Sequence, residues 1–110
     1  MAQPRTRSGV VCSVSPLGAQ LHASRTTALL KSTQLELVRI VLKAGQGLPQ
    51  HQAPGEITVQ CLEGCLEFST GATTQRMQAG DLIHLCANEP HALLALEDCS
   101  ALLTINLRGA

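Results

Sequence analysis

From Thr26 onward the chain is a succession of short β-branched and leucine-rich runs, each closed by residues that favour tight turns. No stretch of helix length shows a competing 3.6-residue period. The runs occupy residues 26–32, 35–45, 56–64, 65–71, 74–81, 82–85, 91–98 and 100–107. Eight short strands in so few residues must close or stack to cover their edges. We therefore expect an all-β domain, a small barrel or a jelly-roll sandwich.

Residues 1–24 mix Pro, Gly, Ser and Ala without a sustained period. They are predicted to form a short irregular N-terminal arm, with one helical turn near Leu17 to Leu21. The arm is taken as residues 1–24 and the barrel domain as residues 25–110. Because the chain has 110 residues, of which 45% are hydrophobic and 15% charged, we expect one packed domain and not a disordered chain.

The charges are uneven although the net charge is zero. Residues 1–43 hold six Lys and Arg against one acid, and residues 44–110 hold two against seven. A basic arm lying across an acidic body, its own or a second subunit's, is one use of this asymmetry, and scattered solvated charges are the other. Nucleic acid is not an expected partner, since the chain has no net positive field and Phe68 is its one aromatic residue.

The cysteines indicate a reducing compartment. There are five of them, Cys12, Cys61, Cys65, Cys86 and Cys99, an odd number without the dense spacing of a disulfide scaffold. The N-terminal apolar run is interrupted by polar residues and by proline, which is unlike a signal-peptide core. No run of about 18 apolar residues could span a membrane. We expect a cytoplasmic protein without a membrane partner.

Two spaced motifs resemble the two sequence boxes of the cupins. In the first, five residues separate Gly45 from His51, and Gly64 closes the box. In the second, Gly80 is followed at the family's intervals by Cys86 at the proline place, Asn88 at the glycine place, and His91. The resemblance covers roughly residues 35–107. It implies a cupin double-stranded β-helix barrel, jelly-roll-like, and in many members a metal held by three histidines and one glutamate.

The chain departs from the family at two of these four ligands. Ala53 stands at the second histidine place and Ile57 at the glutamate place. A catalytic zinc keeps three protein ligands, and iron sites with two histidines also need a carboxylate. We therefore expect no tightly held cofactor. Weak binding of Fe, Zn, Ni or Mn by His51 and His91 is the alternative.

The predicted pocket residues are His51, Ile57, Val59, Cys61 and His91, since strand alternation turns the side chains of 57, 59 and 61 to one face. The two histidines are expected to face one another, as inherited residues without a task or as polar anchors for a small, mostly apolar ligand. Cys61 is interpreted either as a small buried residue or as a third, soft ligand. Cys86 is interpreted as filler or as a thiolate activated by an imidazole.

Three functions stay open on these residues. The first is a module that binds a small molecule without metal. The second is an enzyme of oxygenase or isomerase type that uses His51 and His91, weakly metallated or metal-free. The third is a structural dimer, because the strand at residues 36–42 is largely apolar on both faces and a second subunit would cover the outer one. A homodimer through barrel strands is the expected partner arrangement.

Overall fold

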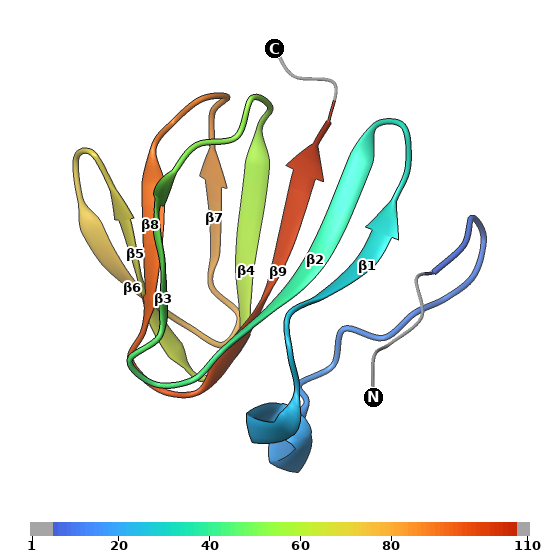
Figure 1. Cartoon of the computed structure of the whole chain (residues 1–110), viewed down its shortest axis with the longest axis horizontal. Helices are drawn as coiled ribbons and strands as arrows, with labels where there is room; N and C mark the ends of the chain where they lie inside the picture. Colours follow the sequence, from blue (N-terminus) through green and yellow to red (C-terminus); the bar gives the residue numbers. More distant parts are fainter. Residues whose placement is uncertain (1–5, 108–110) are drawn as a thin grey trace.

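The computed structural model describes residues 6–107, and within them the chain forms two antiparallel sheets that face each other (Figure 1). The five-stranded sheet has the order β1 (Thr27–Lys31), β2 (Leu35–Leu42), β9 (Cys99–Asn106), β4 (Ile57–Glu63), β7 (Leu82–Leu85). The four-stranded sheet has the order β3 (Gly47–His51), β8 (His91–Ala95), β5 (Cys65–Thr70), β6 (Thr74–Gln78). Most connections cross from one sheet to the other. The prediction of an all-β, jelly-roll-like barrel is confirmed.

The strand that the sequence did not predict is β3. Residues 47–51 lie outside the strand-like runs of the sequence, and Pro49 among them lacks the N–H that a central strand needs. In the structure β3 is one of the two edge strands of its sheet, and its pairing with β8 is irregular between Leu48 and His51. Proline is tolerated there because an edge strand leaves part of its backbone unpaired.

The core lies between the two sheets. Along β4, Ile57, Val59 and Cys61 point inward and are 4%, 1% and 0% exposed, while the residues between them are less buried. This alternation is what a strand with one face on the core requires. The opposite sheet contributes Leu66 and Phe68, both fully buried. The predicted inward face of residues 57–61 is therefore present.

Gly64 makes the turn from β4 into β5 with a φ of +80°. A Cβ atom there would lie 2.8 Å from the Cα of Cys99, and it would also meet the carbonyl oxygen of Asp98. Glycine is required for both reasons, since left-handed backbone and missing space each disfavour any other residue. The family's closing glycine therefore keeps its conformational task in this chain.

The arm runs along the outside of the five-stranded sheet, below β1 and β2 in Figure 1. It contains a 3₁₀ helix, η1 (Gly18–Ala23), close to the predicted helical turn. Barrel strands begin at Thr27, near the predicted boundary at residue 25. Residues 1–5 of the predicted arm and 108–110 of the predicted barrel lie outside the described residues.

Three outward-facing side chains of the barrel, which we call the arm clamp, hold the arm: Arg39, Glu63 and Ser100. Arg39 donates from Nη1 to the carbonyl of Ser15 at 3.0 Å and from Nη2 to that of Ser13 at 3.2 Å. Glu63 accepts from the backbone N–H of Leu17 at 2.8 Å, and of the following Gly18 at 3.0 Å. Ser100 also donates to the Glu63 carboxylate. The barrel thus binds the arm through its main chain.

Arg39 and Ser100 of the arm clamp are buried, Glu63 is partly buried, and the charges of Arg39 and Glu63 are opposite. Arg39 is 4% exposed, and its Nε is a buried atom without a partner among residues 6–107. Burial by itself would raise the pKa of Glu63, but the hydrogen bonds from Ser100 and the arm, with the charge of Arg39, lower that pKa below its ordinary value. The outer face of β2, expected to lie under a second subunit, is covered in part by the chain's own arm.

All five cysteines are free thiols in the structure. No helix within residues 6–107 has the length and apolar character needed to cross a bilayer.

Candidate functional site

His51 and His91 lie together at one end of the barrel, as expected. His51 ends β3, His91 begins β8, and the two residues are register partners in the antiparallel pair. Their ring centroids are 4.2 Å apart, with the planes inclined at 58°. We call this end the barrel mouth, made by His51, His91 and the loops at residues 52–56 and 86–90.

Each imidazole is oriented by a carbonyl two residues before it in the chain. The Nδ1 of His51 lies 2.9 Å from the oxygen of Pro49, and the Nδ1 of His91 lies 3.1 Å from the oxygen of Glu89. A carbonyl oxygen only accepts, so Nδ1 carries the proton in both rings. Within residues 6–107 neither Nε2 has a hydrogen-bond partner. The mouth therefore holds two imidazole nitrogens that no group of the described chain uses.

Phe68, from β5, supports His91 from the interior. The two rings are stacked, with centroids 5.5 Å apart and planes inclined at 7°. Phe68 is fully buried and His91 is 4% exposed, whereas His51 is exposed. Burial lowers the pKa of His91 below its ordinary value, and the neighbouring His51 adds to this, against the opposing hydrogen bond to Glu89. His91 is therefore neutral near pH 7, with its Nε2 lone pair available.

The rim of the mouth is held by a contact between its two loops. The backbone N–H of Asn88 donates to the carbonyl of Ala53 at 2.7 Å. Asn88 has a φ of +64°, a left-handed conformation that asparagine tolerates better than most residues. Asparagine therefore preserves the backbone shape at the place where the family pattern has glycine.

The mouth does not fit a tightly bound metal. Ala53 and Ile57 offer no donor atoms, and no group of three or more His, Cys, Asp or Glu side chains in residues 6–107 could hold an ion. Glu56 does not substitute, because its side chain is exposed and lies 2.7 Å from the Nε2 of His84. Two imidazoles alone are fewer ligands than zinc or non-haem iron sites use.

The remaining predicted pocket residues are core residues in the structure. With exposures of 4% or less, Ile57, Val59 and Cys61 have almost no surface for an added molecule to touch. Cys61 lies at the other end of β4 from Ile57, and its Sγ is 3.6 Å from the carbonyl of Glu63. The structure thus does not bring Cys61 to the histidines.

The thiols differ in exposure. Burial raises the pKa of Cys61, and it raises the pKa of Cys99 to about 11, so both thiols stay protonated at neutral pH. Cys86 is exposed on the rim loop, where its N–H donates to the carboxylate of Glu89 at 3.3 Å. No contact between its sulfur and an imidazole is present among the described residues.

Sequence reasoning did not identify Phe68 or the carbonyls of Pro49 and Glu89 as parts of the site. A signal was present: each histidine follows its acceptor by two residues, in Pro49-Gln50-His51 and in Glu89-Pro90-His91. The arm clamp gave no comparable signal, because the arm contributes backbone carbonyl and N–H groups, which every residue except proline carries.

The facing sheets and the paired histidines at one mouth define a small double-stranded β-helix barrel protein. Residues 38–105 match the family described as the cupin domain, which is more than half of the chain, and the protein belongs to that family. Comparison with curated proteins gives no significant match.

Among solved structures, the chain is similar to a conserved protein of unknown function from Streptococcus pyogenes, at 30% identity and a TM-score of 0.71 over 77% of this chain and 75% of that one. It is also similar to an RmlC-like cupin protein from Desulfovibrio desulfuricans, at 28% identity and a TM-score of 0.73 over 89% and 98%. A cupin superfamily protein from Desulfitobacterium hafniense, 14% identical, has a TM-score of 0.77 over 97% and 98%, which bears on the fold alone.

Proposed function

We propose that this cupin binds a small molecule at the barrel mouth, with His51 and His91 fixing its orientation and without a tightly held metal. The observation that carries the proposal is the shared tautomer of the two rings. Both Nδ1 protons are donated to backbone carbonyls, so both Nε2 atoms are left as acceptors 
at one site.

The ligand that suits this arrangement carries a hydrogen-bond donor on a mostly apolar body. A hydroxyl or N–H group would satisfy Nε2 of His91, which is neutral near pH 7. Apolar surface of the ligand would lie on Leu48 and Ala53, which are partly buried and pack against the core near the mouth. Ile57, which is buried at the mouth end of β4, would support the mouth from within.

Matched pairs of compounds test this. Phenols and small alcohols would be screened by thermal shift and native mass spectrometry against their O-methyl ethers, which lack the donor. We expect binders that lose about tenfold or more in affinity on methylation, since an unpaired polar group in a binding site costs about 1–3 kcal/mol. His91→Phe, which keeps a ring beside Phe68 and removes the acceptor Nε2, should abolish the preference, whereas His22→Ala, on η1 and away from the mouth, should retain it. Equal binding of both members of each pair would refute the proposed role of the imidazoles.

Chelators supply the matching test for the absence of a tight cofactor. A pair of imidazoles without a carboxylate supports at most weak binding of Fe, Zn, Ni or Mn. Treatment with EDTA should therefore leave both the melting temperature and ligand binding unchanged. A fall in either, restored by one of these metals, would contradict the proposal.

We also propose a homodimer that forms through the outer face of the five-stranded sheet. Leu82 on β7 is 64% exposed and Leu35 on β2 is 42% exposed, and both point away from the core. Single exposed leucines are ordinary, but two on one sheet face beyond the arm favour a partner there. Sedimentation analysis should give a dimer that Leu82→Glu converts to a monomer; a wild-type monomer at high concentration would refute this.

A cytoplasmic location is the inference from the thiols. Five unpaired cysteines, two of them exposed, suit a reducing compartment. Fractionation of cells that produce the protein would test it, and recovery outside the cytoplasm would contradict it.

A further inference from the structure

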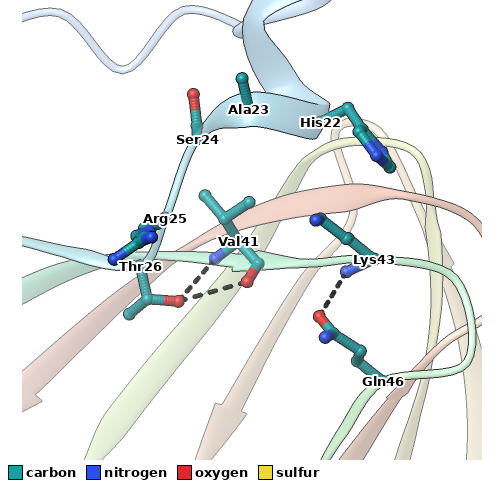
Figure 2. A pocket seen from close by; sticks show the side chains of 8 residues that line it. All are labelled: His22, Ala23, Ser24, Arg25, Thr26, Val41, Lys43 and Gln46. Carbon is teal, nitrogen blue, oxygen red and sulfur yellow. Dashed lines mark hydrogen bonds between the residues drawn. The ribbon is translucent and has the colours of Figure 1, made fainter. Parts of the chain in front are cut away.

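A cavity lies at the opposite end of the barrel from His51, where the arm meets the connection between β2 and β3 (Figure 2). Its volume is about 340 Å³. One wall comes from the arm and the other from the barrel. The lining residues are His22, Ala23, Ser24, Arg25, Thr26, Val41, Lys43 and Gln46. We call it the basic cavity.

The lining is unusual for a ligand pocket because it is mostly polar, with basic side chains on both walls. Figure 2 shows Arg25 and Lys43 on either side of Val41, with His22 at the end of η1 on the Lys43 side. Within residues 6–107 neither Arg25 nor Lys43 has a carboxylate within ion-pair distance. Two cationic groups therefore line one cavity, and neither is in contact with an acidic side chain of the described residues.

The acid beside the cavity is already engaged. Asp98 accepts from the backbone N–H of Ala44 at 2.9 Å and lies 3.0 Å from Nδ1 of His22. The Ala44 N–H, followed by His22, lowers the pKa of Asp98, so this carboxylate is charged at neutral pH. The charge of Lys43 also lowers the pKa of Asp98, although the two groups are not within ion-pair distance. The guanidinium of Arg25 and the ammonium of Lys43 thus have no carboxylate in contact with them among the described residues.

Two other polar side chains line the cavity. The hydroxyl of Thr26 is already hydrogen-bonded, whereas the amide of Gln46 keeps a free donor. Thr26 accepts from the N–H of Val41 at 2.9 Å and bonds its carbonyl at 3.3 Å, so its hydroxyl is satisfied. Gln46 accepts through Oε1 from the N–H of Lys43 at 2.9 Å. Its amide N–H₂ has no partner among the described residues. Apart from the second ring nitrogen of His22, the free side-chain groups at the cavity are thus donors, and those of Arg25 and Lys43 are charged.

We propose that the basic cavity binds a small oxyanion, a phosphate or carboxylate group, between Arg25 and Lys43. A guanidinium pairs with such a group through two parallel N–H bonds, and an ammonium adds a point charge. The volume is at the lower end of the range for small-molecule pockets, which suits one compact anion. Because the two cations stand on opposite walls, the anion would also bridge the arm and the barrel.

The test is an NMR titration of the full chain with inorganic phosphate and, separately, with citrate, each at constant ionic strength balanced with chloride. We expect saturable shifts confined to residues 22–26 and 41–46, with the tighter of the two anions identifying the preferred oxyanion. The double variant Arg25→Gln/Lys43→Gln should weaken binding about tenfold or more, since charge-assisted hydrogen bonds are lost. The control Lys31→Gln/Arg76→Gln changes two exposed cations elsewhere and should bind as the wild type does.

Trypsin gives an independent readout of the bridge between arm and barrel. Cleavage after Arg25 should slow in the presence of the bound anion, while cleavage after Arg76 should not. Shifts spread over all basic residues, binding unchanged in Arg25→Gln/Lys43→Gln, or no saturation by tens of millimolar of either anion at fixed ionic strength would each overturn the proposal.

Discussion

The barrel mouth and the arm clamp use polar side chains in opposite ways. In the arm clamp, Glu63 accepts three hydrogen bonds and Arg39 donates two, so the chain itself satisfies nearly every polar atom. At the mouth, His51 and His91 each donate a hydrogen bond from one ring nitrogen to a backbone carbonyl, and the other ring nitrogen has no partner among the described residues. Saturated groups stabilise a fold, whereas unused acceptors at an opening are available to a ligand.

The difference predicts where a substitution lowers stability and where it lowers only binding. Polar residues of the arm clamp should affect the free energy of unfolding and the release of the arm. His51, at the exposed side of the mouth, should affect ligand binding alone. His91 lies between these cases, because it is both buried and part of the mouth.

The largest effect is expected for Arg39→Met, which keeps most of the side-chain volume and removes the guanidinium. It would leave the Glu63 carboxylate without its neighbouring cation and two arm carbonyls without donors. We expect a loss of about 2–3 kcal/mol in the free energy of unfolding, with faster proteolysis of the arm. Arg76→Met, an exposed control on β6, should cost less than about 0.5 kcal/mol. Equal losses in the two variants would show that the guanidinium does not hold the arm.

Glu63→Gln should cost less, about 1–2 kcal/mol, because the amide turns a donor toward groups that themselves donate. The folded-state pKa of Glu63 is lowered, so its contribution is present above the ordinary glutamate pKa and is lost as pH falls through the folded value. Denaturant unfolding should therefore lose stability below about pH 4.3 more steeply in the wild type than in the variant. The pKa of Asp98 is also lowered, but Asp98 is present in both proteins and affects their pH curves equally. Parallel pH curves for the two proteins would contradict the assignment.

His91→Ala removes the ring that stacks on Phe68 and exposes part of the core. We expect a loss of about 1–2 kcal/mol, the stacking contribution and a small cavity together. Thermal or denaturant unfolding measures it, and an unchanged midpoint would show that the stacked ring adds nothing to the core.

His51→Ala should change stability by less than about 0.5 kcal/mol, since the side chain is exposed and its one hydrogen bond is local. Ligand binding at the mouth should nevertheless be lost. A variant that is as destabilised as His91→Ala would mean that the mouth is built for stability, like the arm clamp, and the comparison would fail.

Much of the fold was predictable because its signals are local. Strand alternation at residues 57–61 and the turn at Gly64 appear in the structure as the sequence indicated. The edge strand β3 was not predicted. Pro49 is acceptable in a strand only where no backbone N–H is needed, as at an edge, and edge position is a property of the whole sheet.

The site was predictable in part. Two spaced glycine motifs indicated that His51 and His91 would meet, and the structure has them as register partners. Cys61 shares a face with Ile57 but lies at the far end of the strand, because alternation fixes the face and not the distance from the mouth. The arm clamp could not be predicted from the sequence, because its side chains bind main-chain groups of the arm. A count of charges over the arm does not show which barrel side chains contact these main-chain groups.

The metal content of the protein, purified without added metal or chelator, tests the central claim most directly. Two imidazoles without a third ligand should retain less than about 0.1 equivalent of iron, zinc, nickel or manganese per chain. Near-stoichiometric metal that disappears in both His51→Ala and His91→Ala would contradict the account, because the two Nε2 atoms would then be metal ligands and not acceptors for a small molecule.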